Sequence, residues 1–150
     1  MRLLVQRVTR ASVRDGDELL GEIGLGALVL AGIGTDDDAT TVDGMADKLL
    51  GLRYFRDADG RTNLAIADVG GSFLVVSQFT LYADTSRGRR PGFTRAALPE
   101  QAVPLVDRFV ERLRGAGVPV ETGRFRAEME VDLVNDGPFT LVLDSERDLG

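Results

Sequence analysis

The 150-residue chain contains no cysteine, no histidine and no tryptophan. Without cysteine it can form neither disulfides nor the thiolates that bind zinc or attack carbonyl carbon. Without histidine it cannot build a nucleophile–histidine triad, and it lacks the one side chain whose unperturbed pKa suits proton transfer near pH 7. An enzyme of this composition must carry out its chemistry with other groups.

Long apolar runs are also absent, because no stretch approaches the roughly 20 residues needed to span a bilayer. The first ten residues alternate charged and apolar side chains and lack the apolar centre of a signal peptide. With 43% hydrophobic residues, 28% charged residues and a net charge of −6, the composition is typical of a globular protein. We expect one soluble, cytoplasmic domain over residues 1–150, with no membrane contact.

Lysine is scarce: Lys48 is the only lysine among the 18 basic residues, so the other 17 are arginines. A guanidinium group is planar and matches the geometry of phosphate better than an ammonium group does. The positions of the arginines are therefore informative although the chain is acidic overall.

Hydrophobic alternation and turn signals predict seven or eight strands and two main helices. One helix is expected after a capping box formed by Thr35 and Asp38, and the second over Pro99 to Arg114. The strands follow one another mostly in hairpin order, which favours an α+β fold around a strongly bent antiparallel sheet or open β-barrel. The expected strands are 2–14, 19–23, 27–33, 72–82, 118–121, 128–134 and 139–143.

Polar side chains interrupt the apolar strand expected over 72–82, where Ser77, Gln78, Phe79 and Thr80 follow one another. A buried strand does not carry unpaired polar groups without a cost in free energy. Cross-strand hydrogen bonds within the sheet would satisfy them. Alternatively, this segment is the wall of a pocket, with Gln78 polarising a carbonyl group and Thr80 acting as a nucleophile or an anchor.

Two further segments each have a structural and a functional interpretation. The first is an exposed loop with four arginines, which either is simply solvated or binds phosphates, with Arg7 or Arg53 as further candidates; its arginines are Arg87, Arg89, Arg90 and Arg95. The second is Gly137-Pro138, which lies between two expected strands and either forms an ordinary turn or has a specific role, because proline supplies no N–H to a ladder.

Two clusters of acidic residues are expected to be solvated rather than to bind metal. Asp36 to Asp38 lie where the start of a helix favours negative charge. Glu128, Glu130 and Asp132 alternate along a strand and are expected on its wet face.

Three of these segments resemble the signature sequences of the D-aminoacyl-tRNA deacylases: SQFTLY at 77–82, GRRPGF at 88–93 and NDGPFT at 135–140. Their order and spacing match the family, as do RLLVQRVTRASV near the start and VPVETGRF at 118–125. The resemblance extends to about Asp144. Phe139 and Gly92 depart from the valine and serine that are more usual at those positions.

The resemblance implies a homodimer that hydrolyses the ester joining a D-amino acid, or mischarged glycine, to tRNA, without a metal or other cofactor. In this family the Gly-Pro peptide is cis and enters the pocket of the partner subunit, which here would be Gly137-Pro138. The residues Ser77 to Leu81 would form the receiving wall. Ser77, Gly137 and Pro138 would thus bind substrate, Gln78, Phe79 and Thr80 would be catalytic, and Arg87, Arg89, Arg90 and Arg95 would bind the acceptor end of the tRNA.

An aminoacyl ester is already activated, so the lack of histidine is compatible with this reaction. Backbone N–H groups near Phe79 and Thr80 would stabilise the oxyanion, with Gln78 as a further donor. Thr80 is expected to position the substrate rather than attack it, because no base activates its hydroxyl; a vicinal ribose hydroxyl would assist proton movement. The alternative is a binding protein of the same fold, without turnover, whose ligand is a nucleic acid or a free D-amino acid.

Overall fold

The computed structural model describes residues 1–150. Two long helices, α1 (Ala39–Gly51) and α2 (Pro99–Gly115), are accompanied by a short α3 (Ser145–Asp148) and the 3₁₀ turns η1 (Ile66–Val69) and η2 (Phe79–Tyr82). None of the helices is both long and apolar enough to cross a membrane. The strands are β1 (Arg2–Asp15), β2 (Glu18–Ile23), β3 (Gly26–Gly32), β4 (Phe55–Arg56), β5 (Thr62–Leu64), β6 (Ser72–Ser77), β7 (Val120–Thr122) and β8 (Glu130–Asp144).

The first strand is the centre of the sheet. β8 pairs with β1 from the Arg2–Asp144 pair to the Arg14–Glu130 pair, so it takes one edge of β1, while β3 and β2 share the other edge. β3 then pairs with β6, and β6 with β7, and both of these pairings are parallel. The expectation of an antiparallel sheet is wrong for these two pairings. The helices α1 and α2 follow β3 and β6 and provide the crossovers that parallel pairing requires.

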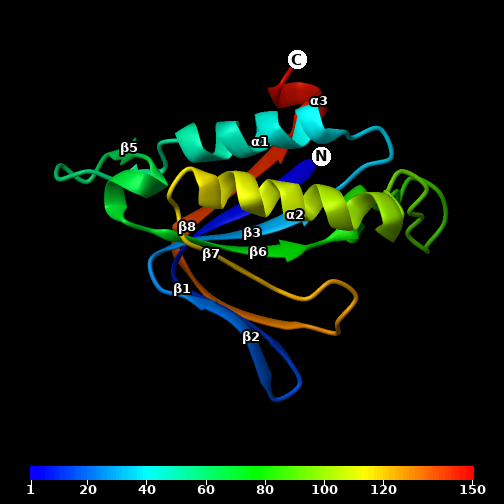
Figure 1. The fold of residues 1–150 in the computed structure, drawn as a ribbon, viewed down its shortest axis with the longest axis horizontal. Helices are drawn as coiled ribbons and strands as arrows, with labels where there is room; N and C mark the ends of the chain where they lie inside the picture. The colour runs from blue at the N-terminus through cyan, green and yellow to red at the C-terminus, as the bar shows by residue number, and fades with distance from the viewer.

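Both long helices cover the same face of the sheet (Figure 1). They are joined by bidentate ion pairs from Arg108 to Asp43 and from Arg112 to Asp47, each with a shortest N–O distance of 2.7 Å. The main core lies between these helices and the sheet and includes Leu3, Val5, Val29, Met45, Leu49, Phe109 and Leu113.

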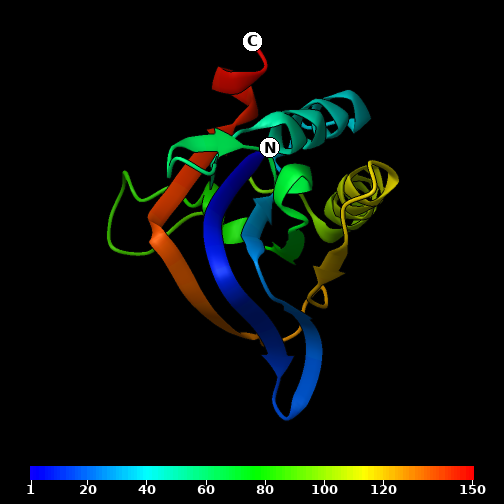
Figure 2. The same cartoon turned by 90° about the vertical axis from the view of Figure 1, so that its left-hand side faces the viewer.

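The sheet bends strongly along β1 and β8 (Figure 2). A second, smaller core occupies its other face and includes Val8, Val13, Ile23, Leu28, Leu74 and Val76. β3 therefore has buried side chains on both faces, as its almost uniformly apolar sequence predicts. The predicted α+β class and the bent sheet are confirmed, together with the second helix at Pro99.

The start of α1 differs from the expected capping box. Asp38, not Thr35, is the N-cap, and its carboxylate accepts a hydrogen bond from the backbone N–H of Thr41 at 2.9 Å. This bond and a second one from the hydroxyl of Thr41 lower the pKa of Asp38. The neighbouring Asp37 is nearly buried and pairs with the amino group of Met1. The prediction that the cluster Asp36 to Asp38 is solvated is therefore wrong at Asp37.

Two strand boundaries also differ from the prediction. β6 ends at Ser77, and η2 replaces the expected continuation of the strand. In contrast, 130–144 form one strand with an interruption: Gln6 pairs with Thr140 and Val8 with Asn135, so that residues 136–139 lie opposite Arg7 alone. Gly137-Pro138 lies within this interruption, where the missing N–H of proline costs no ladder hydrogen bond.

Candidate active site

A largely apolar cavity of about 530 Å³ lies beside the end of β6. This size is within the range of small-molecule sites. Its wall combines the start of η2, the segment leading into α2, and the connection between β7 and β8. The residues from these elements include Val76, Ser77, Gln78, Phe79, Phe93, Leu98, Ala102, Phe125, Arg126 and Met129.

The polar segment that follows β6 lies at this cavity. The backbone N–H of Gln78 donates to the carbonyl oxygen of Ala31 at 2.8 Å, and beyond this bond the chain turns away from the sheet into η2. The side-chain amide of Gln78 donates to the hydroxyl of Thr80. Ser77, Gln78 and Phe79 line the cavity, while Thr80 is exposed next to them. Ser77 is the last residue of β6, whereas Gln78 and Thr80 lie past the strand, and their side chains bond to each other and not across the sheet.

The backbone N–H groups of Phe79 and Thr80 donate to no side chain and to no backbone oxygen outside the helices and strands. They belong to the first residues of a helical turn, whose N–H groups have no acceptor within the turn. Two adjacent N–H groups at the start of a helical turn, beside an apolar cavity, are suited to stabilising an oxyanion.

Two aromatic side chains meet at the cavity. Phe79 is 55% exposed, and its ring contacts that of Phe93 edge to face, with the centroids 4.9 Å apart. Phe93 follows the arginine-containing loop, which is closed by hydrogen bonds between Asp84 and Gly92. The Phe79–Phe93 contact therefore connects this loop to the cavity.

The only ionisable side chain that lines the cavity is Arg126. A nucleophilic threonine needs a base that removes its proton, and the side chain bonded to the Thr80 hydroxyl is the amide of Gln78, which is not a base. The hydroxyl of Thr80 is instead an acceptor for Gln78. This environment favours a positioning role for Thr80.

Gly137 and Pro138 do not line this cavity. Both are exposed, and the peptide bond between them is cis. The buried Arg7 supports this segment through its guanidinium, which donates to the carbonyl oxygen of Asp136 at 3.0 Å. The same guanidinium donates to the carbonyl oxygen of Tyr54 at 2.6 Å.

Arg7 is 3% exposed and lies over the ring of Phe139, 4.7 Å from its centroid. Burial is the main cause that lowers its pKa. The interpretation of Arg7 as a phosphate ligand is therefore wrong. The sequence contained a signal for its position, because side chains alternate along a strand and Arg7 continues the buried series of Leu3 and Val5.

Asn135 completes the support of the Gly-Pro segment. Its side-chain amide donates to the carbonyl oxygens of Arg7 at 2.8 Å and Phe139 at 2.9 Å. Its side-chain oxygen accepts from the N–H of Phe139 at 3.2 Å. Asn135 and Arg7 thus satisfy backbone groups that the interrupted ladder leaves unpaired.

The four arginines of the loop region have two different environments. Arg87, Arg89 and Arg90 are exposed and form no ion pair within the chain. Arg95 is paired with Glu146 and lies over the ring of Tyr82, 5.8 Å from its centroid. Three of the four are free to meet an anion, whereas Arg95 already has an anionic partner.

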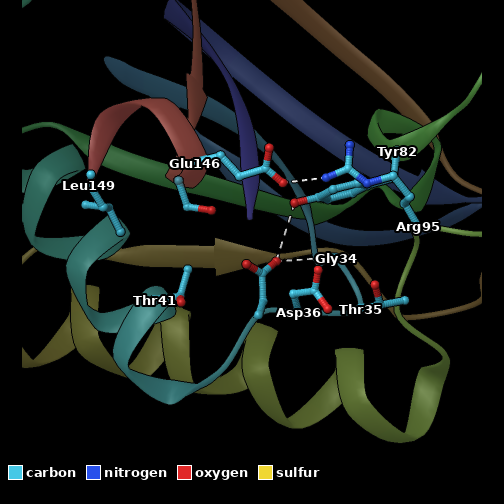
Figure 3. A pocket seen from close by; sticks show the side chains of 11 residues that line it. Gly34, Thr35, Asp36, Thr41, Tyr82, Arg95, Glu146 and Leu149 are labelled. Atoms are coloured by element: carbon cyan, nitrogen blue, oxygen red, sulfur yellow. Dashed lines mark hydrogen bonds and ion pairs between the residues drawn. The ribbon is translucent and has the colours of Figure 1, made fainter.

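A second hollow of about 370 Å³ lies between the start of α1 and the C-terminal α3 (Figure 3). Here Arg95 meets Glu146, and Asp37 accepts from the N–H of Gly34 at 2.6 Å and from the Tyr82 hydroxyl at 3.5 Å. Burial, followed by the charge of Asp37, raises the pKa of Tyr82. Arg95 and Glu146 pair with each other and Asp37 pairs with the amino group of Met1, so this hollow differs from the cavity beside β6, which contains no carboxylate.

Known proteins resemble this chain over nearly its whole length. The family described as D-Tyr-tRNA(Tyr) deacylase matches residues 4–144. A D-aminoacyl-tRNA deacylase from Symbiobacterium thermophilum is 57% identical, with 98% of this chain and 97% of that protein covered. One from a Roseiflexus species is 58% identical, with 97% and 94% covered.

Solved structures show the same fold. One, described as c-Myc DNA Unwinding Element Binding Protein, has a TM-score of 0.91 and 40% identity and covers 96% of this chain and 98% of its own. Another, described as a probable eukaryotic D-amino acid tRNA deacylase, has a TM-score of 0.85 at 18% identity, covering 95% and 97%, and supports the fold alone. The family match and the identity to its members, over almost the full length of both chains, show that this chain belongs to the D-Tyr-tRNA(Tyr) deacylase family.

Proposed function

We propose that this chain hydrolyses the ester of D-aminoacyl-tRNA, and of glycine mischarged on tRNA, and releases the free amino acid and tRNA. The observation that carries the proposal is that η2 begins at the cavity beside β6, so that the N–H groups of Phe79 and Thr80 have no acceptor within the helical turn. Relatives of more than 50% identity that are named D-aminoacyl-tRNA deacylase support it.

The reaction requires little chemistry from the side chains. Water attacks the ester carbonyl carbon, and the two N–H groups stabilise the negative charge on the carbonyl oxygen. The bond between the carbonyl carbon and the ribose oxygen then breaks, and the ribose oxygen takes up the proton that the attacking water loses, with the vicinal ribose hydroxyl assisting the transfer. Gln78 and Thr80 hold the ester in the orientation that the attack requires, and this orientation raises the rate of hydrolysis.

Selectivity for D-amino acids would come from a second copy of the chain. Once the amine and the ester carbonyl are fixed, D and L substrates differ only in the direction of the side chain, so blocking one direction rejects the L form. Gly137 and Pro138 are exposed and firmly supported by Arg7. Such a block would admit glycine, which has no side chain to exclude.

A homodimer in which Gly137-Pro138 enters the pocket of the partner is supported by the surface around this segment. The outer edge of β8 has no strand partner, and Val142 on this strand is 56% exposed.

The mass in solution, measured by light scattering, should be twice that of the 16.2 kDa chain. Replacement of Gly137-Pro138 by Ala-Ala should weaken L-rejection or abolish substrate binding; unchanged selectivity for D over L would refute this role.

We further propose that the tRNA is bound near its acceptor end, mainly by Arg87, Arg89 and Arg90. A protein with a net charge of −6 offers little basic surface for phosphate contacts along the whole tRNA. The salt dependence of binding reports the number of phosphate contacts. A slope equivalent to about eight or more contacts would contradict acceptor-end binding.

A second candidate function is binding of nucleic acid without turnover. It is favoured by the similarity to a structure named as a DNA-unwinding-element binding protein and by the free arginines of the loop. A protein that only binds nucleic acid has no need of an apolar cavity with the start of a helical turn at its wall.

One experiment separates the two candidates. Catalytic amounts of the protein are incubated with D-Tyr-tRNA and, in parallel, with L-Tyr-tRNA, and the released tyrosine is measured. Several turnovers on the D substrate alone establish the deacylase. Stoichiometric binding without release of tyrosine would establish the binding protein instead.

A further inference from the structure

A single basic side chain at the wall of the cavity has no partner within the protein. Arg126 lies in the connection between β7 and β8, is exposed, and forms no side-chain hydrogen bond or ion pair. Its neighbour Arg124 is different, because it pairs with Glu18 at 2.6 Å and with Asp15 at 3.5 Å. Of the two arginines in this turn, Arg124 forms ion pairs within the protein and Arg126 forms none.

The backbone at Arg126 is unfavourable for arginine. The N–H of Ala127 donates to the carbonyl oxygen of Arg124 at 3.2 Å, which closes a four-residue turn with Arg126 in third place. Arg126 has a φ of 65° and is the only non-glycine residue of the chain with positive φ. Turns with positive φ at this place favour glycine or asparagine. Local conformation therefore does not explain an arginine here, and strained residues of this kind cluster at functional sites.

The cavity wall also connects Arg126 to the loop that carries Arg87, Arg89 and Arg90. Phe93, which follows these arginines, lines the same cavity as Arg126. Figure 1 shows the arginine loop and the β7–β8 connection toward the same end of the molecule, away from β5. No carboxylate lines the cavity and competes for this guanidinium.

We propose that Arg126 binds a backbone phosphate of the single-stranded 3′ end of the RNA whose terminal ester occupies the cavity. This inference rests on the proposed function, and it adds a basic group from the β7–β8 connection to those of the arginine loop. An arginine that only holds a phosphate acts equally in the ground state and the transition state, so it affects KM and not kcat.

The test is the salt dependence of binding to tRNA that carries D-tyrosine through a stable 3′-amide. Asparagine tolerates positive φ, so Arg126→Asn removes the charge without adding backbone strain. Arg61→Asn is the matched control, because Arg61 is also exposed and unpaired but lies on the distant β4–β5 hairpin. We expect Arg126→Asn to weaken binding about three- to fivefold at moderate salt and to reduce the salt slope by about 0.7 to 1. Arg126→Lys should restore the slope, and Arg61→Asn should change neither quantity.

Stability is the second readout. The thermal midpoint of Arg126→Asn should be no lower than that of the wild type, because asparagine relieves the backbone. An unchanged salt slope in Arg126→Asn, an equal loss in Arg61→Asn, or a lower thermal midpoint together with the loss of binding would each overturn the assignment. Absence of D-Tyr-tRNA hydrolysis by the wild type would refute the proposed function instead, and the salt slopes would still report whether Arg126 meets a phosphate.

Discussion

The guanidinium of Arg7 donates to the carbonyl oxygen of Asp136, 3.0 Å away, immediately before the exposed Gly137-Pro138. The first strand thereby fixes a segment near the other end of the chain, 129 positions away. The same guanidinium lies 3.4 Å from the carboxylate of Asp136. One buried side chain thus holds this segment through both its backbone and its charge.

Arg7→Lys should destabilise the protein by about 2–3 kcal/mol, because a lysine keeps the charge but cannot reach both carbonyl oxygens that the buried fork satisfies. Urea unfolding at pH 7 measures this change. Arg10→Lys is the control, since Arg10 is 64% exposed on the same strand and pairs with Asp132 on the surface. The control should change stability by less than about 0.5 kcal/mol. Equal effects of the two substitutions would contradict the anchoring role of Arg7.

Thr80→Ala should retain substantial turnover of D-Tyr-tRNA, within about tenfold of the wild type, because it removes only a positioning hydrogen bond to Gln78. Single-turnover kinetics measure the chemical step directly. Circular dichroism verifies that the fold persists. Complete loss of hydrolysis in a folded variant would identify Thr80 as the nucleophile.

The rate should show no enzyme-derived titration near pH 6.5. The chain has no histidine, and no carboxylate, lysine or tyrosine lines the cavity. The substrate's α-amino group titrates at about 7.7–8, so the profile of kcat/KM is recorded between about pH 5.5 and 7. A break near pH 6.5 that is caused by the enzyme would require a proton-transfer group that this site does not contain.

The ion pairs between α1 and α2 should make stability depend on acid pH. Hydrogen bonds from Arg108 and Arg112 lower the pKa values of Asp43 and Asp47. Because the folded-state pKa is below the unfolded value, of about 3.9, the stabilisation is present above that value and is lost as the pH falls through the folded-state pKa.

The double variant Asp43→Asn/Asp47→Asn should therefore have a lower urea midpoint than the wild type at pH 7 and a similar midpoint at pH 2. Asp107→Asn, at an exposed position of α2 without an ion pair, should match the wild type at both values. A difference from the wild type that is the same at pH 7 and pH 2 would exclude these ion pairs as its cause.

Tyr54→Phe should leave stability unchanged or raise it by about 1 kcal/mol, because the hydroxyl of Tyr54 is buried without a hydrogen-bond partner. Burial also raises the pKa of this phenol. The ring itself stays in contact with Phe139, 6.0 Å between centroids. Calorimetry measures the change, and a marked loss of stability would mean that the hydroxyl has a partner in solution.

The elements with strong hydrophobic periodicity were predictable from the sequence, whereas the pairing of strands was not. Apolar spacing and Pro99 defined the second helix, and Asp15-Gly16 correctly indicated the first hairpin. The parallel pairing of β3 with β6 depends on where α1 packs, which is a tertiary property. The order strand, helix, strand was nonetheless a usable signal for it.

For the candidate site, the sequence identified Ser77, Gln78 and Phe79, which do line one cavity. It did not indicate that the strand ends at Ser77, because Phe79 to Tyr82 has the apolar content of a strand although it forms the helical turn η2. It also could not separate Arg95 from its neighbours, since Glu146 approaches it from 51 positions away.

The pairing of the first strand with the last has a consequence for synthesis on the ribosome. One edge of β1 is occupied only by β8, which extends to Asp144. A nascent chain that has not yet released 130–144 therefore exposes the hydrogen-bonding edge of a 14-residue strand, and such edges can pair with other chains. We conclude that this edge of β1 gains its partner only once residues 130–144 have left the ribosome, and that it is open to other chains until then.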